Sequence, residues 1–527
     1  MIDRIVLMRV DREEERVRRG TFGRLGAALA AGWLVALLLP GCGGGASPTA
    51  SASQLEARLA ASASPVVGEP LMLDATASVV PTTGTLQYAW AVKDPAGETV
   101  GLADAAGTRP YFVPATAGTY GIELRITATA PSGASAQSPL ARLDVAVAAS
   151  STPTVAEVRA RVRSLAAAAS APEAPDGSAP TIAVGDPGAA SRITGSRLLA
   201  WTRPEFVYNG DVVQAGSVYP DYLFGANRAV SYSAALRGGT YATIDFSTDA
   251  TEFEILQKGL GAASNLWVLV DGRLARNAAT TLPSDGELYL TRVTFGSKAT
   301  RRVRLVMTSP YFGGIRVGAA DSVTRPVPGT RLRAMFLGDS ITEGTAGQSA
   351  RASFAALAAE RLGWHEAWIS GVGATGYLAA PAPKLTLRQR LATDVIAYKP
   401  HVLVIAAGVN DLGFTDAQIE AEAATLFDEI QAALPDTLVF VTGPVATLNR
   451  VRGGVNAAIK AAVGTRANFI WVPNVDEPWL TGTGTVSRPR GDGNADQYIS
   501  ADITHPTPAG IDYLAGRLAD FIKQAVN

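Results

Sequence analysis

The chain has 527 residues, of which 47% are hydrophobic and 18% charged, and its formal net charge is -1. This length exceeds that of one compact domain, and the composition excludes a disordered chain and a nucleic-acid-binding surface. A single cysteine excludes an intramolecular disulfide framework and a cysteine metal cluster, and the three histidines, His365, His401 and His505, are too far apart in the sequence to predict a metal site. We therefore expect chemistry that uses neither a metal nor an organic cofactor.

The N-terminal segment has the pattern of an export signal. An arginine-rich stretch leads into an apolar run at residues 25–39, which is too short to predict a spanning helix. The motif Leu39-Pro40-Gly41-Cys42 resembles a bacterial lipobox, and this resemblance implies that Cys42 is the lipidated first residue of the mature protein. The alternative is an ordinary cleavage site followed by an incidental cysteine. We predict a signal peptide at 1–41, a small and polar tether at 42–54, and a lipid anchor in the bacterial cell envelope.

Residues 55–149 predict an all-β domain. Short alternating apolar runs, such as 86–92 and 120–129, are separated by turn residues, a pattern typical of a β-sandwich. The phrases Val-Gly-Glu-Pro, Tyr-Ala-Trp and Ala-Gly-Thr-Tyr in this segment resemble the polycystic-kidney-disease (PKD) type of immunoglobulin-like domain, with Trp90 in the core. Such a domain is either a spacer or a carbohydrate-binding module, and the spacer is the simpler interpretation.

Two further segments precede the C-terminal region. Residues 150–194 are rich in Ala, Ser and Pro and predict a linker with a short helix near 155–169. Residues 195–327 contain further strand-like runs and resemble the jelly-roll domain that precedes the catalytic domain in some carbohydrate esterases. Three aromatic residues on these runs could stack on sugars, although aromatic residues on strands more often belong to the core. They are Trp267, Tyr289 and Tyr311.

The pattern changes at residues 328–527 to apolar strands that alternate with helices. The strand-like runs begin at Arg333, Ala367, His401, Thr437 and Phe469, and their continuous apolar character favours buried parallel strands. A capping-box motif at 415–418 begins a helix whose apolar residues share one face. We predict a three-layer, doubly wound α/β domain, in which ligands bind at the carboxyl ends of the strands.

Four motifs follow strand ends or lie near the C-terminus. They are Gly-Asp-Ser-Ile-Thr-Glu-Gly at 338–344, Gly-Val-Gly-Ala-Thr-Gly-Tyr at 371–377, Gly-Val-Asn-Asp at 408–411 and Asp-Ile-Thr-His-Pro-Thr at 502–507. In order, spacing and strand context they resemble the four blocks of the SGNH hydrolases, or GDSL-type esterases. The resemblance implies a flavodoxin-like fold and a serine esterase.

The residue chemistry supports the same hypothesis. A serine hydroxyl is a poor nucleophile unless a base lies within hydrogen-bond reach and a third group orients that base. Ser340 at a strand-to-helix turn has a candidate base in His505, and Asp502 lies three residues before that histidine. The negative charge that develops on the carbonyl oxygen needs preorganised donors, for which we predict the backbone amides of Ser340 and Gly373 and the side-chain amide of Asn410.

Four further polar residues of the C-terminal region are predicted to support the structure rather than to take part in catalysis. His401 begins a strand at its amino end, away from the site, and His365 follows a helix, so both are interpreted as structural. Asp339 and Asp411 flank predicted site residues and are interpreted as turn and hydrogen-bonding supports rather than acids.

The sequence therefore predicts an exported serine esterase that removes short acyl groups, with acetate expected, from a carbohydrate. Two β domains on an anchored enzyme suit a polymeric substrate, and the loops at 479–484 and 491–494 resemble loops of SGNH carbohydrate esterases. One alternative is an arylesterase or lysophospholipase of the cell envelope. Another is a carbohydrate-binding surface protein with a silent hydrolase domain, although binding alone would not require Ser340, Gly373, Asn410, Asp502 and His505 together.

Overall fold

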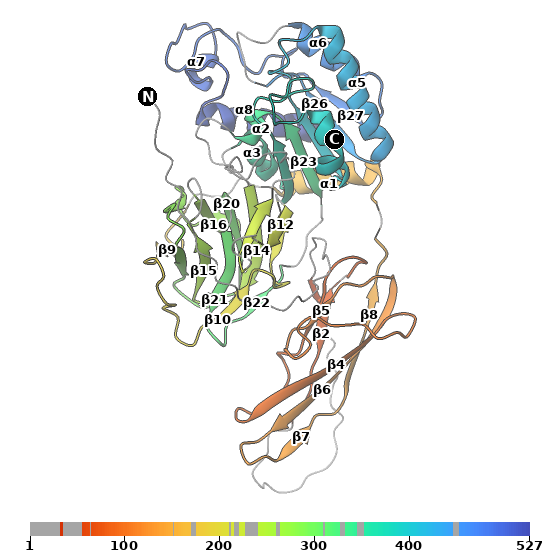
Figure 1. Cartoon of the computed structure of the whole chain (residues 1–527), viewed down its shortest axis with the longest axis vertical. Coiled ribbons are helices and arrows are strands. Elements are labelled where there is room, and N and C mark those ends of the chain that lie inside the picture. Colours follow the sequence, from red (N-terminus) through yellow and green to blue (C-terminus); the bar gives the residue numbers. More distant parts are fainter. Residues whose placement is uncertain are drawn as a thin grey trace, which may run out of the picture.

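The computed structural model divides into three regions along its long axis (Figure 1). It describes residues 32–34, 55–63, 65–150, 152–169, 175–209, 212–215, 221–226, 241–259, 264–308, 311–326, 332–344, 353–445 and 453–527. The predicted lipidation site Cys42 lies outside the described residues. The helices that are described lack the combination of length and hydropathy that a membrane crossing requires.

The N-terminal β region contains two antiparallel sheets that share one core. One sheet has the order β1-β2-β3-β5, and the other joins β4, β7 and β8 to the central strand β6. Side chains from both sheets, among them Leu71, Phe112 and Ile122, are buried against one another. Trp90, predicted to lie in the core, is only partly buried and packs against it. The strands are β1 (Gly32–Leu34), β2 (Ala60–Ala63), β3 (Leu71–Asp74), β4 (Thr85–Lys93), β5 (Tyr111–Phe112), β6 (Gly118–Thr129), β7 (Ser135–Gln137) and β8 (Ala141–Val147).

The middle β region also has two sheets with a common core. One sheet has the order β12-β13-β21-β15-β19-β9 with β10 on β21, and the other has the order β11-β14-β20-β16-β17 with β18 on β16 and β22 on β14. The two sheets bury Phe246, Leu305, Ile255 and Phe312 between them. The strands are β9 (Thr181–Val184), β10 (Arg197–Ala200), β11 (Val207–Asn209), β12 (Val212–Ala215), β13 (Leu223–Ala226), β14 (Tyr241–Thr248), β15 (Glu252–Lys258), β16 (Ser264–Val270), β17 (Arg273–Leu274), β18 (Thr280–Leu282), β19 (Leu288–Thr294), β20 (Arg301–Thr308), β21 (Tyr311–Val317) and β22 (Val323–Thr324).

The predicted linker at 150–194 is not a free connection. Its helix α1 (Val155–Ala168) buries Val158 and Val162 in the core of the C-terminal region, and β9 pairs with β19 of the middle β region. The guanidinium of Arg159 donates to the carbonyl of Ala525 at 3.2 Å. The high Ala and Ser content suggested a flexible segment, but apolar residues four apart on one helix face are enough to bury it against the sheet.

The C-terminal region confirms the predicted parallel sheet. Its five strands have the order β24-β23-β25-β26-β27, and every pair is parallel. The chain runs from β23 to β24 on one side and then crosses to β25 on the other side of β23, so the topological switch point lies at the end of β23. The strands are β23 (Arg333–Gly338), β24 (Glu366–Gly371), β25 (Val402–Ala406), β26 (Leu438–Thr442) and β27 (Phe469–Val472).

Helices cover both faces of this sheet, as a three-layer fold requires. Helices α1, α3 and α8 share a core with Phe336 and Val404, whereas α5, α6 and the segment after α4 pack against Leu337 and Ile405. Because Phe336 and Leu337 are neighbours on one strand, their side chains point to opposite faces. The helices are α2 (Ser340–Glu343), α3 (Phe354–Arg361), α4 (Leu387–Arg390), the π-helix η3 (Leu391–Ile396), α5 (Asp416–Ala433), α6 (Gly453–Val463), α7 (Ala495–Tyr498) and α8 (Pro508–Ala525).

The middle β region packs directly on the C-terminal region. Trp267 and Val306 of the middle region share an apolar cluster with Ala356 of α3. Beside this cluster, the Arg304 guanidinium donates to Nδ1 of His365 at 2.9 Å and is paired with the buried carboxylate of Asp245. Burial, together with the Arg304 charge, lowers the pKa of His365 to about 4. His365 is therefore a neutral acceptor in this interface, in agreement with its predicted structural role.

Candidate active site

At the first motif, residues 338–344, the chain turns sharply from β23 into α2. The Asp339 side chain accepts a hydrogen bond from the amide of Ile341 at 3.0 Å and caps the helix, and Gly344 ends it in the left-handed region at φ +91°. A Cβ atom at Gly338 would lie 2.1 Å from Oγ1 of Thr342, so only glycine fits at the end of the strand. Ser340 is consequently the first helical residue, at the carboxyl end of the sheet.

Ser340, His505 and Asp502 form one chain of hydrogen bonds. Oγ of Ser340 lies 2.9 Å from Nε2 of His505, and Nδ1 of the same imidazole lies 2.6 Å from Oδ2 of Asp502. These contacts join residues 165 positions apart, at the two ends of the C-terminal region. The arrangement is that of a nucleophile, a base and a group that orients the base.

Asp502 is held as a carboxylate by a set of local donors. Its Oδ1 accepts from the hydroxyl of Ser500 at 2.7 Å and from the amides of Thr504 and His505 at 2.9 Å each. Burial opposes ionisation, but hydrogen bonds from His505, Ser500 and Thr504 outweigh it and hold the pKa of Asp502 well below its usual range. The other carboxylate oxygen is therefore a charged acceptor for the imidazole.

Two of the predicted oxyanion donors, Asn410 and Gly373, make hydrogen bonds within the protein. The carboxamide of Asn410 donates one N–H to the carbonyl of Thr375 at 2.9 Å, which leaves its second N–H for a substrate oxygen. The amide of Gly373, in contrast, donates to Oε2 of Glu343 at 2.7 Å. Gly373 is close to the nucleophile, since a Cβ atom on it would lie 3.6 Å from Cβ of Ser340. The loop after β24 thus lies close to Ser340, but the Gly373 N–H already has a carboxylate partner, and its role as an oxyanion donor stays a prediction.

Asp339 and Asp411 have the supporting positions that the sequence predicted. The Asp411 carboxylate accepts from the amides of Tyr377, Leu378 and Ala379 at 2.8 to 2.9 Å, and so it fixes the loop after β24. Burial, with the neighbouring Asp411 charge, raises the pKa of Asp339 to about 7. Both carboxylates lie beneath the site and hold backbone amides.

Sequence reasoning missed a buried ion pair below the strand ends. Arg390 is 1% exposed, donates to the carbonyls of Ser370 and Gly338 at 3.0 Å, and lies 3.5 Å from the carboxylate of Asp394. It therefore joins β23 to β24 just before their active-site loops. The only signal in the sequence was an Arg and an Asp four residues apart, a spacing common on exposed helices, where such pairs contribute little. The π-helix η3 begins at this point, and single π-turns are frequent near functional sites.

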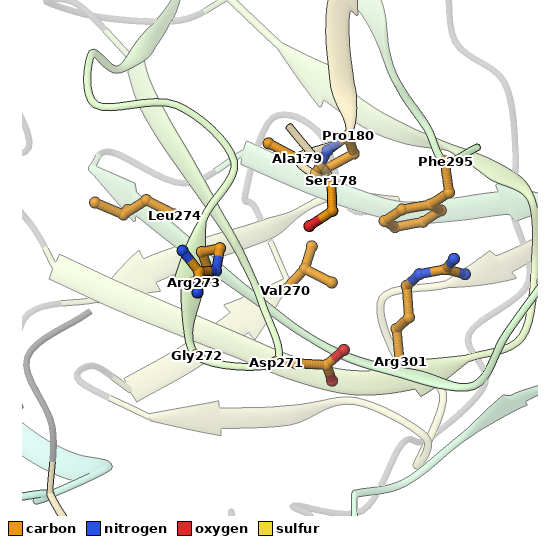
Figure 2. Close-up of a pocket in the computed structure, with 10 residues that line it drawn as sticks. All are labelled: Ser178, Ala179, Pro180, Val270, Asp271, Gly272, Arg273, Leu274, Phe295 and Arg301. Atoms are coloured by element: carbon orange, nitrogen blue, oxygen red, sulfur yellow. The ribbon is translucent and has the colours of Figure 1, made fainter. Parts of the chain in front are cut away.

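The three aromatic residues considered for sugar stacking are mainly part of the core. Trp267 is 7% and Tyr289 is 4% exposed, and Tyr311 is half-buried. A separate cavity of about 300 Å³ opens in the middle β region, and none of the three aromatic residues lines it (Figure 2). There the guanidinium of Arg301 lies 4.3 Å from the ring centroid of Phe295, so it already covers one face of that ring.

No group of three or more His, Cys, Asp or Glu side chains in the described residues is arranged to hold a metal ion.

His401, which was predicted to have a structural role, lies at the amino end of β25, where its Nδ1 accepts a hydrogen bond from the amide of Arg333 at 3.2 Å. It is therefore at the opposite end of the sheet from Ser340.

We expect Asn410→Ala to lower kcat by about 10²–10³ with a much smaller change in KM, because the second N–H stabilises mainly the transition state. Steady-state kinetics on a small activated ester measures this effect. Asn468→Ala is a matched control, because the Asn468 amide also donates to a backbone carbonyl, that of Pro435, at a site remote from Ser340. A rise in KM alone would instead assign Asn410 to substrate positioning.

One family model matches the part of the chain that contains Ser340, Asp502 and His505. Residues 336–512 match the GDSL-like Lipase/Acylhydrolase family. A search of curated proteins finds no match. Among solved structures, a family two carbohydrate esterase from Clostridium thermocellum, in complex with cellohexaose, is 18% identical, with 61% of this chain and 98% of that chain covered and a TM-score of 0.45.

Two further solved structures match this chain with similar sequence identity, coverage and TM-score. A salicylyl-acyltransferase from a tetracycline biosynthetic pathway is 16% identical, with 62% of this chain and 96% of that chain covered and a TM-score of 0.45. An acetyl xylan esterase from the rumen bacterium Butyrivibrio proteoclasticus is 14% identical, with 61% of this chain and 96% of that chain covered and a TM-score of 0.43. The C-terminal region is a GDSL/SGNH hydrolase domain, and the protein is an esterase.

Proposed function

We propose that this GDSL/SGNH domain removes short acyl groups, with acetate as the expected one, from a carbohydrate or polysaccharide through an acyl-enzyme. The hydrogen-bond chain from Ser340 through His505 to Asp502 is the observation that supports the reaction most directly. Its distances of 2.9 Å and 2.6 Å allow proton transfer from the hydroxyl to the imidazole without rearrangement.

In the first half-reaction, Oγ of Ser340 attacks the carbonyl carbon of the ester and its proton moves to Nε2 of His505. The carbonyl oxygen of the ester becomes an oxyanion, which the second N–H of Asn410 stabilises. The imidazolium is stabilised by Asp502 and then protonates the departing sugar oxygen, so the C–O bond breaks and the acyl group remains on Ser340. In the second half-reaction His505 takes a proton from a water molecule, whose oxygen adds to the acyl carbon. The bond between that carbon and Oγ of Ser340 then breaks, the acid is released, and the imidazolium returns its proton to Oγ.

The carbohydrate assignment rests on two loops of the C-terminal region and on the β regions that precede it. The loop at 479–484 is tied to the loop at 491–494, since the amide of Thr481 donates to Asn494 at 2.8 Å and that of Thr483 to Asp492 at 2.9 Å. These loops are short and polar, as suits a hydroxyl-rich substrate better than a long acyl chain. The two preceding β regions suit an enzyme that works on a polymer, and we propose that the first of them is a PKD-type spacer domain.

We also propose that the protein is exported and held in the bacterial cell envelope by a lipid on Cys42. The support is the pattern at residues 25–42, with an apolar run that ends at a single cysteine. Metabolic labelling with a fatty acid tests this: the wild type should carry the label and Cys42→Ser should not, while an unlabelled wild type would refute the anchor.

The substrate proposal is tested by comparing acetate release from acetylated polysaccharides with the cleavage of nitrophenyl esters from acetyl to dodecanoyl, with Ser340→Ala as the background. We expect acetate release from at least one polysaccharide and a kcat/KM that falls as the acyl chain lengthens. Faster cleavage of esters with long acyl chains would favour a lysophospholipase. Activity confined to aryl esters would favour an arylesterase. Absence of hydrolysis on every ester would favour a silent hydrolase domain.

A further inference from the structure

The cavity in the middle β region is built where a hairpin turn meets the ends of two other strands (Figure 2). Asp271 and Gly272 form the turn between β16 and β17, Phe295 follows β19, Arg301 begins β20, and Ser178 lies just before β9. The volume of about 300 Å³ is at the lower end of the range for small-molecule sites, about 300–1,000 Å³. The cavity therefore suits a small ligand or a short part of a longer one.

Asp271 provides a hydrogen-bond acceptor in the wall of this cavity. Its Oδ1 accepts from the amide of Arg302 at 2.8 Å, and its own amide donates to the Arg302 carbonyl at 2.8 Å, so the turn is fixed against β20. Within the described residues, Oδ2 of Asp271 has no hydrogen-bond donor, and the side chain is exposed. Oδ2 is therefore a charged acceptor that is available to a ligand.

Arg301 provides donors in the same cavity. Its two terminal nitrogens donate to the carbonyls of Ala299 and Ser297 at 2.9 Å each, and the second also reaches the Ser297 hydroxyl at 3.4 Å. A guanidinium has five N–H groups, and these contacts do not use all of them. In the part of the chain that the structure describes, these three contacts and the stacking on Phe295 are the interactions of the guanidinium, and none of them is with a carboxylate.

The combination of charges in the wall distinguishes between classes of ligand. An anion would be repelled by Asp271, and a cation would be repelled by Arg301 and by Arg273, which also lines the cavity and pairs with Asp176 at 3.2 Å. A sugar ring carries no charge, its hydroxyl groups both donate and accept, and its C–H groups can pack on apolar side chains such as Val270. The wall of the cavity therefore matches a neutral saccharide better than an ion of either sign.

We propose that this cavity is a binding site for a neutral saccharide, in which Oδ2 of Asp271 accepts from one sugar hydroxyl and the Arg301 guanidinium donates to another. The site belongs to the middle β region and contains neither Ser340 nor His505. It concerns binding without turnover, so it goes beyond the proposed function and does not depend on it.

The test is isothermal titration calorimetry with the full chain, in which cellohexaose, xylohexaose and mannohexaose are neutral probes and trigalacturonate is an anionic one. Asp271→Asn keeps Oδ1 for the Arg302 amide and tolerates the φ of 50° at this position, but it replaces the charged acceptor by a donor. We expect the affinity for at least one hexaose to fall by about 10-fold or more, because hydrogen bonds to charged groups are the stronger ones. Asp186→Asn, an exposed carboxylate of the same region outside the cavity, is the matched control and should bind like the wild type.

Arg301→Met tests the donor independently. A methionine side chain can still pack on the ring of Phe295, but it has no N–H group to offer a sugar hydroxyl. The affinity for the same hexaose should therefore fall here too, whereas Arg276→Met, an exposed arginine outside the cavity, should leave it unchanged. Thermal midpoints show whether each variant is folded, and if Asp271→Asn is not, Arg301→Met decides.

Three results would refute the cavity as a saccharide site. Equal affinities in the wild type and in both cavity variants would place saccharide binding elsewhere in the chain. Absence of binding by all three hexaoses would show that the cavity takes no neutral saccharide, and tighter binding of trigalacturonate would assign it to an anion. If the wild type cleaves no ester, the proposed function fails while the calorimetry still decides this inference. If the wild type is an active esterase and the cavity variants bind as it does, only the inference fails.

Discussion

Ser340→Ala is expected to lower kcat by about 10⁶ while KM changes little, because the variant lacks the only hydroxyl that lies 2.9 Å from Nε2 of His505 in the described residues. Stopped assays with nitrophenyl acetate measure the residual rate, and a fluorophosphonate that labels active serines should label the wild type but not the variant. Ser297→Ala, an exposed serine of the middle β region, is the control.

The residues should also behave as one unit. His505→Ala should cost about as much as Ser340→Ala, and the double variant should retain the same residual activity, because a base without its nucleophile contributes nothing further. Additive losses in the double variant would show that the two side chains act separately. Retention of full activity in Ser340→Ala would show that another residue is the nucleophile.

Asp502→Asn is expected to lower kcat by about 10⁴, a smaller loss than that from Ser340→Ala. Oδ1 of Asp502 accepts three hydrogen bonds and Oδ2 faces Nδ1 of His505, so every oxygen of this side chain has donors directed at it. An asparagine must turn its NH₂ group toward either the imidazole or those donors. Toward the imidazole it favours the tautomer that carries the proton on Nε2, which cannot accept the proton of Ser340.

The pH dependence distinguishes the roles of Asp502 and His505. Because the pKa of Asp502 is held well below its usual range, the carboxylate is ionised throughout an assay near neutral pH. The loss of activity in acid should therefore come from His505, since a protonated imidazole cannot accept the serine proton. A rate that stays constant as the imidazole is protonated would contradict its role as the base.

The lowered pKa of Asp502 also predicts an effect on stability. The ionised carboxylate favours the folded state above the unfolded pKa of about 3.9, and this contribution is lost as the pH falls through the lower folded value. Denaturant titrations should therefore show Asp502→Asn less stable than the wild type near neutral pH, and the difference should shrink below about pH 4. A difference that grows in acid would reverse the sign of the argument.

Much of the fold was determined by short-range patterns in the sequence. The apolar runs from 333 and from 401 became β23 and β25, because a strand buried on both faces must be apolar at every position. Thr415 and Gln418 cap α5 through reciprocal hydrogen bonds, an interaction within one turn that needs no tertiary context. Asp502 reaches His505 for the same reason, since three residues of a turn span the distance.

The contacts made by charged and polar groups across the fold were decided only by the tertiary structure. Glu343 and Gly373 are 30 positions apart, and nothing local indicates that a carboxylate at the end of α2 accepts the amide predicted for the oxyanion. Arg390 resembles a surface residue in the sequence, yet the packing of β24 against β23 encloses it with Asp394. Helix α1 packs in the C-terminal core, although the composition of residues 150–194 predicted a linker. Apolar periodicity specifies which face of an element is buried, but which polar groups then meet depends on how those faces pack, because a buried charge takes whatever partners the completed fold brings within reach.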